Sequence, residues 1–137
     1  MNTKKLEWEE KYSVGVKLID NQHRQMFDTI NLLLGLLGGT PTKEEINEII
    51  SRLIEYKKIH FSTEEGYFKE FNYENAEDHT NKHREFNTSL EKLLSDNKND
   101  LMALAFSLVD FLENWLISHL MYEDQKYVSC FRDHGLV

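Results

Sequence analysis

The longest amphipathic stretch of the chain is residues 42–71, which read TKEEINEIISRLIEYKKIHFSTEEGYFKEF. Thr42 followed by Glu45 matches a capping box, in which each side chain accepts a hydrogen bond from the backbone of the other residue. Beyond it the apolar positions recur at spacings of three and four, the period of one helix face. The stretch therefore predicts one long helix with a single buried seam. The seam positions are Ile46, Ile49, Leu53, Tyr56, His60, Glu64, Tyr67 and Phe71.

Three further segments show the same period, at about residues 19–37, 75–94 and 101–124. The connections between the four segments are short, and no alternation typical of strands runs for a useful length. Four helices in this order predict an all-α fold, an antiparallel up-down-up-down four-helix bundle. Bundles of this kind place cofactor sites in the core, between facing helices.

The ends of the bundle are less regular than its middle. Residues 1–18 show no helical period, so we expect an irregular N-terminal arm that covers part of the core. Asp20 is a possible cap of the first helix, and we expect Gly38-Gly39 to end it, because glycine readily adopts the left-handed conformation that stops a helix. With the bundle over 19–127, the whole chain 1–137 is predicted to be a single domain.

The composition limits the partners and the compartment. The chain of 137 residues carries a net charge of −8, which disfavours nucleic acid and anionic membrane surfaces as partners. Cys130 is the single cysteine, so we expect neither an internal disulfide nor a metal site built from several thiolates. Residues 1–10 lack the apolar core of a signal peptide, and the longest charge-free stretch, 29–42, is too short and polar to span a bilayer. We expect a cytoplasmic protein.

Five of the six histidines fall on the apolar seams: His23, His60, His79, His83 and His119. A single histidine on an apolar face is usually a core residue with a hydrogen-bond partner, but five on facing helices favour a shared metal site. His79 and His83 are four residues apart, so they project from one helix face and can bind one ion together. His60 and Glu64 have the same spacing, and a glutamate on a buried seam needs a partner of opposite charge.

The acidic partner of His119 is ambiguous from spacing. Glu123 lies four residues further on, whereas Asp124 is five residues on and about 140° around an ideal helix. Asp124 reaches the side of His119 only if the helix widens locally into a π-helical turn, which often marks a functional site. Spacing alone leaves both carboxylates open.

Imidazole and carboxylate donors without thiolates suit iron, zinc, manganese or copper. The segment from His79 to His83 lacks the glutamate of the zinc-protease motif H-E-x-x-H. No histidine has a glutamate three residues before it, as ferritin-like di-iron bundles require. Glycine motifs for phosphate, dinucleotide or serine-hydrolase sites do not occur either. The pattern therefore indicates a metal site of another class.

Taken together, these motifs resemble those of the hemerythrin family, most closely its single-domain bacterial members. The resemblance runs in order over nearly the whole chain. The matching segments are Ser13-Val14-Gly15-Val16, Ile19-Asp20, Gln22-His23, His60-Phe61-x-x-Glu64-Glu65, His79-x-x-x-His83-x-x-Phe86 and Trp115-Leu116-x-x-His119-x-x-x-x-Asp124-x-x-Tyr127. The resemblance implies a single hemerythrin-like domain with a non-haem di-iron site.

The resemblance also assigns each ligand and chooses Asp124 over Glu123. The ligands are His79, His83 and His119 for one iron, His23 and His60 for the other, and Glu64 and Asp124 as bridges. With a solvent-derived bridge, the first iron has six ligands and the second has five, which leaves one position open for a diatomic ligand. The implied function is reversible dioxygen binding, with dioxygen held as hydroperoxide at the five-coordinate iron.

Apolar residues within a helical turn of these ligands are expected to wall the open position and to exclude water and protons. They are Met26, Phe61, Phe86, Trp115, Leu116 and Leu120. Each of them also fits a simple role in the core of the bundle.

Storage, transport or delivery of dioxygen, rather than catalysis, is the leading hypothesis, because no catalytic acid or base stands out beyond the ligands. The same open iron suits a di-iron peroxidase or an enzyme that scavenges nitric oxide or peroxide. A sensor that acts through a separate partner is a further alternative. We expect a monomer, with an oxygen-consuming enzyme as a candidate partner.

Overall fold

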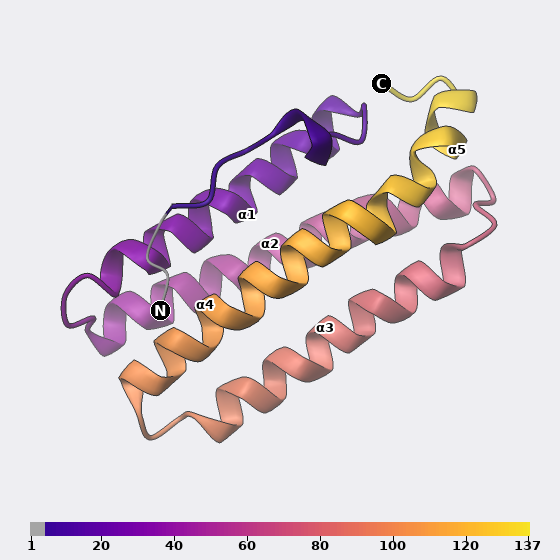
Figure 1. Ribbon diagram of the computed structural model, residues 1–137. Helices are drawn as coiled ribbons and strands as arrows, with labels where there is room; N and C mark the ends of the chain where they lie inside the picture. Colours follow the sequence, from indigo (N-terminus) through magenta and orange to yellow (C-terminus); the bar gives the residue numbers. More distant parts are fainter. Residues whose placement is uncertain (1–4) are drawn as a thin grey trace.

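Four long helices make up most of the chain, as seen in a computed structural model that describes residues 5–137. The helices are α1 Lys17–Leu36, α2 Lys43–Glu70, α3 Ala76–Asp96 and α4 Leu101–Ser118. They run alternately up and down, and each packs against its neighbours in the bundle (Figure 1). No strand occurs in residues 5–137, so the predicted all-α four-helix bundle is confirmed.

The chain continues beyond α4 without a break in helical winding. A π-helical turn, His119–Glu123, is followed by a 3₁₀ turn, Asp124–Tyr127, and by the short helix α5, Val128–Asp133. The sequence period does not predict α5. This last helix stands at the end of the bundle where the turn between α2 and α3 also lies (Figure 1).

The core consists of two clusters of buried apolar residues. One runs along the bundle, and the other lies at one end of it. The larger cluster fills the space between the four long helices and includes the fully buried Ile30, Leu53, Phe86 and Leu108. The smaller cluster forms where the N-terminal arm, the turn between α2 and α3, and α5 meet. Its buried members are Val14, Val16, Ile19, Phe68, Tyr73, Tyr127 and Phe131.

The described part of the N-terminal arm before α1, residues 5–16, is irregular apart from one 3₁₀ turn, Glu10–Tyr12. The Leu6 backbone N–H donates to Asn31 Oδ1 at 2.8 Å, and Asn31 Nδ2 donates to the Leu6 carbonyl at 3.0 Å, which fastens the arm to α1. Tyr12 and Val14 are buried against the two clusters. The arm therefore covers part of the core, as predicted.

The predicted N-terminal capping box of α2 is present, but the predicted cap of α1 is wrong. Thr42 Oγ1 accepts from the Glu45 N–H at 3.1 Å, and Glu45 Oε1 accepts from the Thr42 N–H at 2.9 Å. Asp20 lies inside the first turn of α1 rather than before it. Its carboxylate instead accepts hydrogen bonds from Ser13 Oγ and the Val14 N–H, and so ties the arm to α1.

The predicted glycine stop of α1 is also wrong in its mechanism. Neither Gly38 nor Gly39 has a positive φ, and their N–H groups donate to carbonyls three residues earlier, so the helix tightens before it ends. The left-handed cap occurs instead after α2, at Asn72 with a φ of 51°. There the Tyr73 N–H donates to the Phe68 carbonyl at 2.9 Å and the two rings pack 4.9 Å apart, which is a Schellman motif.

The helical run Leu101–Asp133 is long and apolar enough to cross a membrane by length and composition alone. One such helix is weak evidence, because the core helix of a soluble protein meets the same criteria. This run packs against the other three long helices and places a histidine and an aspartate in the core. We therefore describe it as one of the four helices that surround the core of the bundle.

Candidate metal centre

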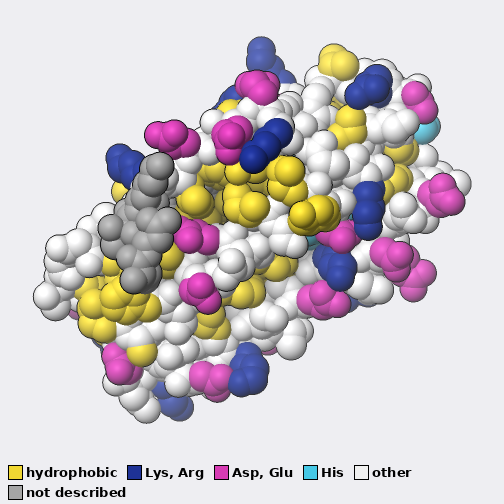
Figure 2. Space-filling view, viewed as in Figure 1, with side chains coloured by type: hydrophobic (Ala, Val, Ile, Leu, Met, Phe, Trp, Pro, Cys, Tyr) yellow, Lys and Arg dark blue, Asp and Glu magenta, His cyan; other side chains and the backbone are white. Residues whose placement is uncertain are grey.

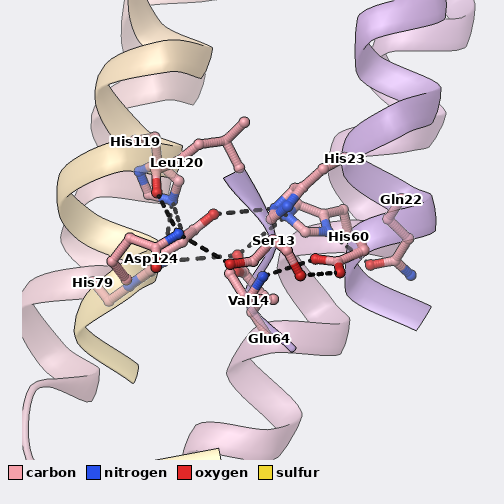
Figure 3. A network of polar contacts seen from close by, with 12 residues as sticks. Ser13, Val14, Gln22, His23, His60, Glu64, His79, His119, Leu120 and Asp124 are labelled. Carbon is pink, nitrogen blue, oxygen red and sulfur yellow. Dashed lines mark hydrogen bonds and ion pairs between the residues drawn. The ribbon is translucent and has the colours of Figure 1, made fainter. Parts of the chain in front are cut away.

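All seven predicted ligand side chains converge on one buried region of the bundle. Figure 3 labels all of them except His83. α1 supplies one of them, α2 and α3 supply two each, and the π-helical and 3₁₀ turns that follow α4 supply one each. Each residue is between 0% and 4% exposed, and the face in Figure 2 accordingly shows histidine only as small spots. The seven residues are His23, His60, Glu64, His79, His83, His119 and Asp124.

Glu64 lies between histidines of two helices. Its Oε1 is 3.1 Å from Nε2 of His83, 3.3 Å from Nε2 of His60 and 3.7 Å from Nε2 of His79. The carboxylate therefore faces the imidazoles of α2 and α3 at once.

Asp124 makes the corresponding contacts on the other side of the site. Its Oδ1 is 3.0 Å from Nε2 of His119 and 3.2 Å from Nε2 of His79, and its Oδ2 is 3.1 Å from Nε2 of His23. The two oxygens thus face different helices. Like Glu64, this carboxylate stands between two groups of imidazoles.

The spacing of the imidazole nitrogens fits two metal ions. The Nε2 atoms of His79 and His119 are 3.0 Å apart, and those of His23 and His60 are 3.2 Å apart. Two ligand atoms bound to one ion at right angles, each about 2.1 Å from it, lie about 3 Å apart. One set, whose ligand atoms lie within 4.8 Å of one another, consists of Glu64 and the larger group of histidines, His79, His83 and His119. The second set consists of both carboxylates and the smaller group, His23 and His60.

The charge of the cluster also favours bound cations. All four carboxylate oxygens of Glu64 and Asp124 are buried and have no hydrogen-bond partner of good geometry in the described part of the chain. Within residues 5–137, no lysine or arginine nitrogen lies within 4.0 Å of either carboxylate. Because buried carboxylates need positive charge close by, and only the histidines stand near these two, the donor set fits bound metal ions.

Contacts within the cluster shift the pKa values of Glu64, Asp124 and His79. Burial alone would raise the pKa of Glu64, but the charge of His60 and the close Nε2 atoms of His60, His79 and His83 hold that pKa well below its ordinary value. Burial and the charge of Glu64 raise the pKa of Asp124, but His119 outweighs them and lowers it. Burial lowers the pKa of His79, whereas the nearby carboxylates of Asp124 and Glu64 raise it to about 10. Without metal, His79 therefore carries a proton that an entering metal ion displaces.

A π-helical turn brings Asp124 to the side of His119. The Asp124 N–H donates to the His119 carbonyl five residues earlier, which inserts one extra residue into the winding. Glu123 is displaced towards the surface, where its Oε2 lies 3.6 Å from Nζ of Lys126. Gln125 Nε2 donates to the carbonyl of Leu120 and to carbonyls of the N-terminal arm, so the arm braces this turn. Of the two carboxylates that spacing left open, only Asp124 joins the cluster.

Two hydrogen bonds outside the cluster were not predicted. The Nδ1 of His60 lies 2.7 Å from Gln22 Oε1, and the Nδ1 of His83 lies 2.7 Å from Glu65 Oε2. Both acceptors are chain neighbours of cluster residues, Gln22 before His23 and Glu65 after Glu64. The sequence shows their position beside the ligands, but not which histidine from another helix each would reach.

Two of the predicted wall residues stack directly on His83 and His119, and a third packs against both of them. The Phe61 ring stacks on His83 at 3.8 Å and 6°, and the Trp115 ring stacks on His119 at 4.2 Å and 15°. Phe86 packs edge-on against both, with ring centroids 5.5 Å from Phe61 and 4.6 Å from Trp115. The structure thus places these rings beside the larger group of histidines.

The other three predicted wall residues are aliphatic and fully buried. Met26, Leu116 and Leu120 are at most 2% exposed and belong to the same apolar cluster as the three rings. These three side chains therefore extend the apolar cluster to which the three rings belong. Trp115 alone among the six is half-buried, and with His119 it borders a groove of about 740 Å³ between α3 and α4.

Comparison with known proteins identifies the family. The family model described as the hemerythrin HHE cation binding domain matches residues 14–131 of the chain. The chain belongs to the hemerythrin family. All seven residues of the cluster lie inside the matched region, so the buried group of histidines and carboxylates that could hold metal ions belongs to the hemerythrin domain.

Individual relatives cover nearly the whole hemerythrin domain. A bacteriohemerythrin of Clostridium acetobutylicum is 28% identical over 126 residues, which are 89% of this chain and 98% of that protein. A bacteriohemerythrin of Pseudomonas paraeruginosa is 30% identical over 132 residues, which are 93% of this chain and 82% of that protein. A hemerythrin-like protein of Naegleria gruberi is 24% identical over 120 residues, which are 88% of each chain.

Proposed function

We propose that the centre holds two iron ions and that both buried carboxylates bridge them. One ion would be bound by His79, His83 and His119, and the other by His23 and His60. Each carboxylate faces imidazoles of both groups at 3.0–3.3 Å, which supports the bridging role of Glu64 and Asp124. Donors of this kind, imidazole and carboxylate without thiolate, suit iron.

The donor count makes the two ions unequal. The larger group supplies three nitrogens and two carboxylates, whereas the smaller group supplies two nitrogens and the same two carboxylates. An ion that prefers six ligands therefore keeps more room for an outside molecule on the side of His23 and His60. The unequal number of histidines, three in one set and two in the other, is the single observation that carries the proposed function.

We propose reversible dioxygen binding as that function, for storage, transport or delivery. Two ferrous ions would supply the two electrons that dioxygen takes up on binding and returns on release. The protein's own residues hold the ions, and the apolar walls keep water and protons away from the site. Met26, Leu116 and Leu120 would exclude water beside the open position, and Phe61, Phe86 and Trp115 around the larger group. Cytoplasmic location and a monomeric state are parts of the same proposal.

Iron content and visible absorption test this function. The anaerobically reduced protein should contain two irons per chain, gain charge-transfer bands in air, and lose them again when dioxygen is removed. Bands that appear once and never reverse would contradict reversible binding. Retained colour without two irons would contradict the di-iron site itself.

Peroxide reduction is the second candidate function. The groove between α3 and α4 reaches Trp115, whose ring stacks on His119, and so gives an electron donor a place in contact with the site. Steady turnover of hydrogen peroxide with a reductant, faster than the oxygenated form decays, would favour this enzyme over a dioxygen carrier.

A further inference from the structure

Two histidines of the centre have their outer nitrogen bound to a side chain, and the two acceptors differ in charge. His83 Nδ1 faces a carboxylate oxygen of Glu65 at 2.7 Å. His60 Nδ1 faces the amide oxygen of Gln22, also at 2.7 Å. The Nε2 atom of each ring faces the cluster, so the ring proton is on Nδ1 and is donated outward in both cases.

The carboxylate acceptor changes the donor strength of its histidine. A ring that donates its outer N–H to a carboxylate becomes a more basic metal ligand than one that donates to a neutral amide. Glu65 is the stronger acceptor because its charge is otherwise uncompensated. Within residues 5–137, no lysine or arginine nitrogen lies within 4.0 Å of its carboxylate, and His83 is its one ion-pair partner.

We propose that Glu65 is a positioning residue that acts through His83 and makes the two ions of the centre inequivalent. Its charge strengthens the hold on the ion bound by the larger group and favours the oxidised state of that ion, while Gln22 gives the other ion no such bias. The inference rests on the proposed di-iron site. It adds to the unequal donor count a second difference between the ions, located outside the ligands.

The structure separates the charge of Glu65 from any role in holding the ring. The Phe61 ring stacks on His83 at 3.8 Å and 6° and constrains the orientation of the imidazole independently. Glu65→Gln keeps an oxygen acceptor of the same length and removes only the charge. The side chain of Glu65 is 38% exposed, so the substitution leaves no buried unpaired group in its place.

The decisive comparison is between Glu65→Gln and a control with the same loss of charge. Glu70→Gln, on the same helix, alters an exposed residue without an ion pair in the described part of the chain. Stepwise affinity for Fe²⁺ alone is measured by anaerobic competition with a chromophoric chelator, and the midpoint potentials of the loaded proteins by spectroelectrochemistry.

Glu65→Gln should weaken the binding of one of the two ions by about 10–100-fold, the usual effect of losing such an outer partner. If the oxidised ion loses a further tenfold, the potential of one of the ions rises by about 59 mV. Glu70→Gln should change neither quantity. Gln22→Glu should instead strengthen the binding of the other ion. Glu65→Asp, which keeps the charge, should restore most of the affinity that Glu65→Gln loses.

The inference would be overturned if Glu65→Gln bound both ions with affinities within twofold of the wild-type values and kept the wild-type midpoint potentials. An equal loss at both ions would also overturn it, because it would indicate general loosening of the site. A wild-type protein that binds fewer than two ions refutes the di-iron site and this inference together. A protein that binds two ions but no dioxygen refutes only the proposed function, and the affinity comparison then still decides the role of Glu65.

Discussion

The metal-free protein should lose stability as the pH rises from neutral, and His79 sets the size of the loss. Its folded-state pKa is raised from 6.5 to about 10 by the carboxylates of the cluster, despite burial. A raised pKa means that the folded state holds the proton more tightly than the unfolded state. The resulting stabilisation is complete below the unfolded pKa and disappears as the pH passes through the folded pKa.

The magnitude follows from the two pKa values. A shift from 6.5 to about 10 corresponds to a stabilisation of on the order of 5 kcal/mol at low pH. Between pH 6.5 and 9.5 the free energy of unfolding should therefore fall by roughly 3–4 kcal/mol. Glu64 and Asp124 do not contribute in this window, because their lowered pKa values keep them ionised throughout. The upper limit also stays below the ordinary tyrosine pKa of about 10.

Urea unfolding of the apoprotein at a series of pH values measures this fall. His79→Gln should remove most of the pH dependence, whereas the matched control His134→Gln, at an exposed histidine, should keep it. The iron-loaded protein should show little of it, since a metal-bound imidazole has no proton at its ligating nitrogen. Apoprotein stability that stays level or increases between pH 6.5 and 9.5 would refute the assignment of this proton to His79.

Three further outcomes follow from the geometry. Asp124→Asn should leave no more than one iron per chain, while Glu123→Gln should keep two; equal iron contents by metal analysis would argue against the role of the π-helical turn. Leu116→Asn should oxidise irreversibly in air several-fold faster than the wild type, because it admits protons to a dry site, and an unchanged decay of the visible bands would remove Leu116 from the wall. Thr42→Ala should lower the free energy of unfolding by about 1 kcal/mol through loss of the capping box, and a midpoint in urea equal to that of the wild type would show that the cap is dispensable.

The helical period was sufficient to predict the bundle, because each long helix buries one apolar face and the turns between helices are short. The ends of the helices were harder to predict, because a helix end depends on which backbone N–H and C=O groups form hydrogen bonds there. Gly38-Gly39 has the residue type for a left-handed cap, yet a tightened turn ends α1 there. Asn72, which is not a glycine and for which the sequence predicts no left-handed cap, adopts the left-handed conformation after α2.

In the candidate site, too, helical spacing predicts some contacts, whereas others depend on how the helices pack. Spacings of four predicted that His79 pairs with His83 and His60 with Glu64, because these pairs depend only on α-helical winding. The choice of Asp124 required a π-helical turn, which the sequence allows but its period does not predict. The hydrogen bond from His83 to Glu65 joins two helices across the bundle, so only the packed structure shows it.

Diffraction from crystals of the iron-loaded protein, recorded at the iron absorption edge, tests the central claim most directly. We predict two iron peaks between the four helices, one bound by three imidazoles and one by two, with both buried carboxylates shared between them. A single peak, or two irons with equal and complete sets of protein ligands, would contradict it.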